Sequence, residues 1–392
     1  MRDFDVVVVG GGCSGLWAAR AAAMAGANTL LVEKATRIGE RIVCAEGVGA
    51  DGMAELVDLK PEWVATTIDR VNLFAPGEKT VEFTEQGCGY VLNKGIFLLG
   101  LSRMAAEAGV EMWPGTRATA VKALDSGGVR IDVEAPGRNR TITAGAVVAA
   151  DGVEASIARQ VGIHDGLRAE DVFSCAQYTV APIDADPHTV EFHFGTEISP
   201  GGYAWVFPKG DSVANVGVGV IPGVSADRKP AEYLETFKRR RCPESKILAY
   251  VVGGVPTVKD PSRASKSGVF LAGDAAGITD PVSGAGIVPG MESGAVAGEH
   301  AVRYAATGSD GRAVEKEFAA SLKSLLKDRR IRYAVRKVLS NMDDKELARM
   351  IEATGEYVAG GKTIRGDPFR LVKFMVKVMP NTFGIIKHIV RV

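Results

Sequence analysis

The stretch Val6-Val7-Val8-Val9-Gly10-Gly11-Gly12-Cys13-Ser14-Gly15 stands near the start of the chain and decides its fold. A valine-rich run leading directly into spaced glycines predicts a buried parallel strand and a tight turn. Alanine is frequent in residues 16–25, which predicts a helix packed closely on a sheet. The sequence therefore predicts a Rossmann-like α/β unit at the N-terminus.

This strand–turn–helix unit carries the features that bind a dinucleotide. Gly10 permits the tight turn, Gly12 lets the backbone approach a pyrophosphate, and Gly15 lets the helix pack on the strand. The next predicted strand ends in Glu33, whose carboxylate can accept hydrogen bonds from ribose hydroxyls. A ligand-free glycine turn would explain the glycines alone, but the acidic residue at this spacing favours a nucleotide.

Two further glycine-marked segments favour FAD over NAD. Apolar runs lead to Asp151-Gly152 and to Gly273-Asp274. Asp274 can bind a ribityl chain, and amides near Gly286 can face a flavin ring. Alone, Asp274 would be interpreted as a helix cap. The order of all three segments predicts an FAD site instead.

The composition restricts the class of protein. The chain has 392 residues, 46% of them hydrophobic, and a formal net charge of +0, which fits two or three globular domains and no nucleic-acid binding. Its five cysteines contain no CxxC pair, so we expect neither a disulfide framework nor a metal site, and a cytoplasmic location. We expect no secretory signal and no membrane-spanning segment.

The three segments resemble the p-hydroxybenzoate hydroxylase-like flavoproteins, whose DG and GD fingerprints correspond to the two acidic pairs above. Two more segments resemble the geranylgeranyl reductase family: Arg41-Ile42-Val43-Cys44-Ala45-Glu46-Gly47-Val48-Gly49, and Tyr203-x-Trp205-x-Phe207-Pro208 followed by Gly217-x-Gly219. Members of that family saturate isolated double bonds of isoprenoid chains. The resemblance implies an FAD-dependent reductase that acts on geranylgeranyl chains of archaeal-type membrane lipid precursors.

The resemblance also implies roles for individual residues. The residues expected at the cofactor are Gly10, Gly12, Ser14, Gly15, Glu33, Lys34, Cys44, Ala45, Gly47, Asp151, Asp274, Gly286 and Ile287. A family arginine that reaches the cofactor corresponds to Lys94, which keeps the charge but lacks the guanidinium fork. Arg103, on the following helix, is the alternative.

Reduction of an isolated double bond needs a hydride donor, a proton donor and exclusion of water. Reduced FAD supplies the hydride. Cys44 is the candidate proton donor, with a simple buried apolar group, the commoner role of a free cysteine, as the alternative.

The aromatic segment predicts a substrate wall. Tyr203, Trp205 and Phe207 alternate, so they share one face of a strand and can line an apolar tunnel for a polyprenyl chain. Packing on a core is the alternative. Gly217 and Gly219 favour a ligand, because glycines on a sheet let a bulky group lie close.

The electron donor and the membrane contact are predicted less directly. We expect no second dinucleotide-binding unit for a nicotinamide, so the donor binds transiently, with NAD(P)H and ferredoxin both open. Near the C-terminus, Arg370, Lys373 and Lys377 fall on one helix face. This pattern predicts peripheral contact with the cytoplasmic membrane face, with a helix that caps the core as the alternative.

We predict three parts of mixed α/β structure. A discontinuous FAD domain takes 1–62, 91–163 and 264–300; an antiparallel-sheet substrate domain takes 63–90 and 164–263; a helical domain takes 301–392. A flavin-dependent monooxygenase or halogenase of the same fold is the alternative function. A non-catalytic FAD or electron-transfer module is a third reading, which the apolar, glycine-lined sheet disfavours.

Overall fold

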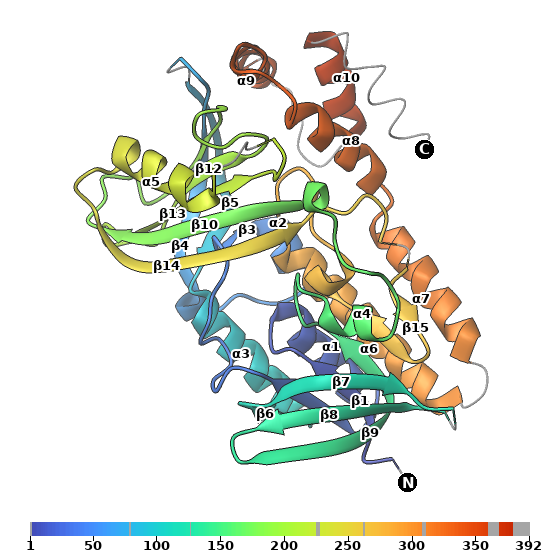
Figure 1. Cartoon of the computed structure of the whole chain (residues 1–392). Coiled ribbons are helices and arrows are strands. Elements are labelled where there is room, and N and C mark those ends of the chain that lie inside the picture. The colour runs from blue at the N-terminus through green and yellow to red at the C-terminus, as the bar shows by residue number, and fades with distance from the viewer. Residues whose placement is uncertain are drawn as a thin grey trace.

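Two sheets organise the protein. The computed structural model describes residues 2–77, 80–125, 127–224, 228–261, 263–307, 311–359 and 368–378. Within these ranges one eight-stranded sheet forms the lower part of the molecule and another forms the upper part (Figure 1). The C-terminal helices run up one side, from the lower sheet to the upper sheet (Figure 1).

The lower sheet is built around the predicted Rossmann-like unit, which is confirmed. Strand β1 (Phe4–Val9) pairs in parallel with β2 (Thr29–Glu33) on one side and β9 (Arg138–Ala149) on the other. The valines of β1 are buried, as expected of a central parallel strand. The remaining strands are β6 (Glu111–Pro114), β7 (Arg117–Ala123), β8 (Val129–Ala135), β15 (Ser265–Lys266) and β16 (Val269–Leu271).

Helix α1 (Cys13–Met24) begins directly after the glycine turn and crosses α6 (Ile287–Thr307) with backbone contact. A Cβ on Gly294 would lie 2.3 Å from the carbonyl oxygen of Ser14, so the crossing requires glycine at this position. The crossing fixes the first glycine segment relative to the third, which leads into α6. Helix α3 (Lys94–Glu107) packs beside α1.

The upper sheet has the order β14-β10-β13-β12-β11-β4-β5-β3 and is antiparallel except for the β11–β4 pair. Its strands are β3 (Gly47–Gly49), β4 (Val64–Phe74), β5 (Thr80–Leu92), β10 (Val172–Ala181), β11 (Thr189–His193), β12 (Tyr203–Pro208), β13 (Ala214–Val220) and β14 (Lys246–Pro256). Helix α5 (Pro230–Arg241) covers one face. One detail differs from the predicted division: β3, assigned to the FAD domain, pairs with β5 in this sheet.

A buried ion pair fastens α5 to the upper sheet. Arg241 donates to Glu191 Oε1 at 2.6 Å and to Oε2 at 2.8 Å, and His193 Nε2 lies 2.8 Å from Oε2. Burial alone would raise the pKa of Glu191, but the hydrogen bonds from Arg241 and His193 outweigh burial and lower the pKa to about 2. Glu191 is therefore a structural carboxylate at neutral pH.

The C-terminal third is helical, with α7 (Gly311–Leu325), α8 (Arg329–Leu339), α9 (Asp344–Ala359) and α10 (Pro368–Val378). The shorter helices are α2 (Ala50–Ala54) and α4 (Ser156–Gln160), with 3₁₀ turns at Pro61–Trp63, Ala169–Asp171 and Gly273–Ala276. Phe374 and Met375 of α10 are buried in a cluster with α8 and α9. Across the described helices, none combines the length and apolarity needed to cross a bilayer.

Candidate functional site

The three glycine-marked segments lie against one another. A Cβ on Gly10 would stand 2.2 Å from the Ala150 carbonyl oxygen, which places the first segment against the second. A Cβ on Gly273 would stand 2.1 Å from Ser14 Oγ, which places the third segment against the first. Segments separated by more than a hundred residues therefore form one site, as their order predicts.

The glycine turn has the shape of a phosphate cradle. Gly10 has a φ of +110°, which favours glycine, and a Cβ on Gly15 would lie 1.9 Å from the Gly10 carbonyl oxygen. Gly12 differs, since nothing lies within 4 Å of the position a Cβ would take. That space lies in front of the N-terminus of α1, whose amides suit a pyrophosphate.

Glu33 and Asp151, two acidic residues predicted at the cofactor, accept hydrogen bonds that fix their carboxylates. Glu33 accepts hydrogen bonds from the Gly11 N–H at 2.6 Å and the Ala35 N–H at 2.7 Å, which holds its carboxylate beside the glycine turn. Asp151 Oδ2 accepts from Ser156 Oγ at 2.8 Å at the start of α4. Asp151 Oδ1 is buried and has no hydrogen-bond partner among the described residues, and Asp151 itself does not line the cavity that its neighbours Ala150 and Gly152 line.

Asp274 is the third acidic residue. Burial raises the pKa of the Asp274 carboxyl. Thr279 Oγ1 donates a hydrogen bond to its Oδ1 at 3.2 Å. The open space at Gly12 before the α1 amides and the carboxyl of Asp274 together fit FAD.

A cavity of about 490 Å³ joins the glycine segments to the upper sheet. The predicted residues that line it are Gly12, Ser14, Cys44, Ala45, Gly47, Lys94, Tyr203, Trp205, Phe207, Gly219, Asp274, Gly286 and Ile287. Residues from the glycine segments beside the lower sheet and residues of the upper sheet thus face one continuous space. Its size is that of a small-molecule site.

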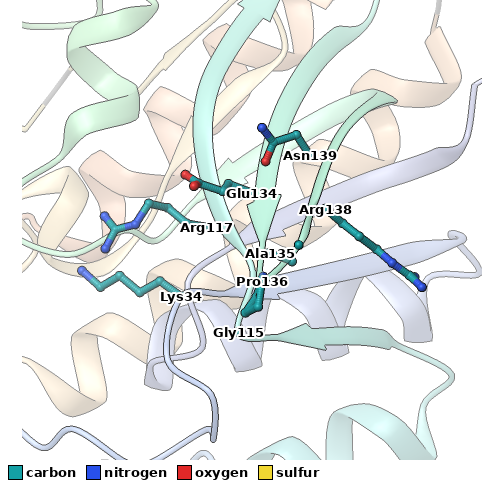
Figure 2. A pocket seen from close by; sticks show the side chains of 9 residues that line it. Lys34, Gly115, Arg117, Glu134, Ala135, Pro136, Arg138 and Asn139 are labelled. Atoms are coloured by element: carbon teal, nitrogen blue, oxygen red, sulfur yellow. The ribbon is translucent and has the colours of Figure 1, made fainter.

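A second hollow, of about 610 Å³, lies apart from this cavity. Lys34 and Arg117 extend from neighbouring strand ends toward the same side, with Glu134 beside them, whereas Arg138 points away (Figure 2). These side chains are all exposed, so the hollow is a polar surface groove. Lys34, predicted at the cofactor, lies here and does not line the cavity.

Two glycines make room for the aromatic rings of the wall, whereas the sequence predicted that glycines of the sheet make room for a ligand. A Cβ on Gly217 would lie 2.2 Å from the indole of Trp205, and one on Gly47 would lie 2.5 Å from the ring of Phe207. Gly217 therefore makes room for the indole and does not itself line the cavity, whereas Gly219 does. The Tyr203 hydroxyl donates to the Ser283 carbonyl, which ties the wall to the loop before Gly286.

Of the two basic candidates on α3, only Lys94 is at the cavity. Burial alone would lower the pKa of Lys94, but the nearby Cys44, Cys13 and Asp274 side chains outweigh burial and raise it. Lys94 is therefore a cation at the glycine end of the cavity. The alternative does not hold, because the Arg103 side chain is exposed and pairs with Glu107 on the next turn of α3.

Several cavity residues were not predicted. Phe173, Cys175 and Gln177 line the cavity from alternate positions of β10, so a period of two along this strand was the available signal. Burial raises the pKa of Cys175 to about 12, which keeps its thiol neutral. Among the described residues, no cluster of three or more His, Cys, Asp or Glu side chains offers a metal site.

The sequence matches two family descriptions. Residues 171–255 match the geranylgeranyl reductase catalytic domain, and residues 5–190 match the FAD dependent oxidoreductase domain. The first match covers the strands of the aromatic wall, and the second covers the glycine turn.

Curated relatives match nearly the whole chain. The digeranylgeranylglycerophospholipid reductase of Methanocella arvoryzae is 38% identical, over 86% of this chain and 89% of the relative. The protein of the same name from Methanoculleus marisnigri is 34% identical, over 97% of this chain and 96% of the relative.

Solved structures agree with this. A geranylgeranyl bacteriochlorophyll reductase-like protein from Thermoplasma acidophilum superposes with a TM-score of 0.90 at 26% identity, covering 98% of this chain and 99% of that one. The flavin-dependent halogenase CmlS has a TM-score of 0.67 at 16% identity, covering 97% of this chain and 78% of that one. The halogenase likeness shows the fold alone.

Proposed function

The chain belongs to the geranylgeranyl reductase family, and from that premise we propose that it saturates isolated carbon–carbon double bonds of geranylgeranyl chains in archaeal-type membrane lipid precursors. It is an FAD-dependent oxidoreductase. The observation that carries the proposal is the continuous cavity. One end is formed by the glycine segments and the other by apolar and aromatic side chains of the upper sheet.

One end of the cavity suits the cofactor and the other suits the lipid chain. Bound FAD supplies a hydride when reduced. The α1 amides and Asp274 suit the cofactor, while Trp205 and Phe207 offer an apolar surface against which a polyprenyl chain can lie. Burial of this wall excludes water from the reacting carbons. Lys94 offers a positive charge beside the cofactor end.

Cys44 is the proposed proton donor for the second carbon. It lines the cavity in the turn that also carries Glu46, and the Glu46 N–H donates to its Sγ at 3.2 Å. We expect Cys44→Ala to retain FAD but to saturate the alkene about a hundredfold more slowly, which is the usual size of a general-acid contribution. The measurement is product formation under anaerobic turnover, scored by mass spectrometry.

Cys242→Ala is the matched control, because Cys242 is a buried thiol between α5 and the sheet, outside the cavity. The control is expected to turn over normally. A Cys44→Ala protein that matches the wild-type rate would remove the thiol from the proton path.

Oxygen dependence tests the reductase against the halogenase or monooxygenase alternative. The purified protein is given a geranylgeranyl lipid and a chemical reductant with and without air. A reductase yields saturated chains without oxygen, and oxygen only diverts electrons from them. Product that requires oxygen or halide would overturn the proposal. NAD(P)H and ferredoxin can be compared as donors in the anaerobic assay.

Peripheral membrane contact through α10 is also proposed. Its apolar residues Phe374 and Met375 are already buried in protein, so the contact would use the exposed Lys373 and Lys377. We expect Lys373→Ala/Lys377→Ala to weaken binding to anionic vesicles about fivefold per lysine, from about 1 kcal/mol per surface lysine. Lys316→Ala on α7 is the control, and unchanged sedimentation of the double variant would dispose of this contact.

A further inference from the structure

A buried polar cluster holds the turn that carries Cys44. Glu46 is only 5% exposed, and both oxygens of its carboxylate are used. Oε1 accepts from the Lys94 N–H at 2.9 Å, and Oε2 accepts from Asn215 Nδ2 at 2.7 Å and from Lys209 Nζ. This cluster includes a full ion pair in the protein interior, where an unpaired charge would be very unfavourable.

The cluster joins the turn to the upper sheet. Lys209 follows β12 and also donates to the Leu92 carbonyl at 3.0 Å. Asn215 on β13 donates to the Ala45 carbonyl at 3.3 Å, and Gln177 on β10 donates to the Cys44 carbonyl at 3.1 Å. Two successive carbonyls and the following carboxylate are thus held by three side chains of one sheet.

The backbone of the turn needs this support. Glu46 has a φ of 71°, in the left-handed region that favours glycine. A glutamate keeps such a conformation only where its surroundings fix it. Without the cluster, the turn would relax and Cys44 would change its direction.

The cluster also reaches the aromatic wall. The Trp205 indole N–H donates to Gln177 Oε1 at 3.0 Å, and the other end of the same amide holds the Cys44 carbonyl. The wall that faces the proposed substrate and the turn that faces the glycine segments are therefore connected through one side chain. An apolar pair could fill the same volume but could not orient the two carbonyls.

We propose that Glu46, Lys209, Asn215 and Gln177 are positioning residues that hold the Cys44 turn in its reactive geometry from the substrate sheet. The role in turnover rests on the proposed function. The role in shaping the flavin end of the cavity does not.

The test is the double variant Glu46→Gln/Lys209→Met, which removes both charges and leaves neither buried alone. We expect it to fold and bind FAD, with a shifted flavin absorption spectrum and midpoint potential. We expect kcat to fall about a hundredfold, the loss associated with a misplacement of about 1 Å, and KM to change little. The single variant Glu46→Gln keeps one acceptor oxygen, for either Asn215 or the Lys94 N–H, and leaves Lys209 without its carboxylate partner, so we expect it to be less stable than the double variant.

The matched control is Glu191→Gln/Arg241→Met. This ion pair also holds a strand of the upper sheet, here to α5, and it lies outside the cavity. It reports the general cost of removing a buried pair, so its kcat and flavin spectrum should stay at wild-type values. Equal losses in both double variants would reduce the Glu46 cluster to a structural element and overturn the proposal.

Wild-type kcat and spectrum in FAD-loaded Glu46→Gln/Lys209→Met would overturn it as well. If the wild-type protein itself reduces no geranylgeranyl chain, the proposed function fails. The flavin spectra and midpoint potentials of the two double variants still decide the positioning role in that case.

Discussion

Gly15→Ala is expected to yield a colourless, destabilised protein. The added Cβ would lie 1.9 Å from the Gly10 carbonyl oxygen and 3.0 Å from its carbonyl carbon, and both are backbone atoms that cannot rotate away. Helix α1 must then move from the turn, and its amides lose their place beside the pyrophosphate. We expect the free energy of unfolding to fall by about 3 kcal/mol, at the upper end for overpacking. Urea unfolding and the flavin absorbance of the purified protein measure the two effects.

Gly12→Ala separates folding from cofactor binding. Its Cβ position is open and its φ of −79° suits alanine, so the protein itself should be stable to within about 0.5 kcal/mol of wild type. The methyl group would occupy the space that we assign to the pyrophosphate, so FAD affinity should fall. A Gly12→Ala protein with normal FAD affinity would show that the phosphates lie elsewhere.

Arg329→Met is the second variant with a large expected effect. Arg329 is 4% exposed, and its guanidinium donates to the carbonyls of Val258 at 2.6 Å, Thr279 at 2.6 Å and Gly277. Burial lowers the pKa of Arg329 to about 10, which still leaves it charged at neutral pH. Each hydrogen bond to a charged group contributes about 1.5–3 kcal/mol, so we expect a loss of about 4 kcal/mol or more.

The same change should weaken FAD binding, because two of the three carbonyls, those of Gly277 and Thr279, belong to the loop between Asp274 and Gly286. Arg330→Met, one residue on, is the control. Arg330 is exposed and pairs with Asp260 at 2.7 Å, a surface ion pair that contributes about 0–1 kcal/mol. Thermal unfolding and FAD titration should separate the two variants clearly. Similar behaviour of both would contradict the role given to the buried guanidinium.

The lower sheet was predictable because its signals are local. A valine-rich strand, a glycine turn and an acidic residue at the strand end each predict a local structure from a few neighbouring residues. The order of the three glycine-marked segments then predicted that they form one site. The aromatic strand was also predictable from local sequence, because alternation puts Tyr203, Trp205 and Phe207 on one face, and all three line the cavity. The functional class came from resemblance and not from these patterns.

The contacts that complete the site were not predictable, because they join residues distant in sequence. Glu46 meets Lys209 only after two strands and a turn have been placed. Arg329 is followed by Arg330 and Arg332, and nothing in this local sequence indicates that its partners are carbonyls of distant segments. Arg103 was plausible by spacing, but a helix places it two turns beyond the cavity, on the exposed side of α3.

Anaerobic single turnover tests the central claim most directly. The bound flavin is reduced chemically, excess reductant is removed, and a geranylgeranyl lipid is mixed in while the flavin absorbance is followed. Because one cavity joins the flavin end to the apolar wall, we predict that the oxidised flavin spectrum returns as double bonds are saturated, with one bond reduced per flavin. A flavin that stays reduced until air is admitted, with the lipid recovered unchanged, would contradict the account.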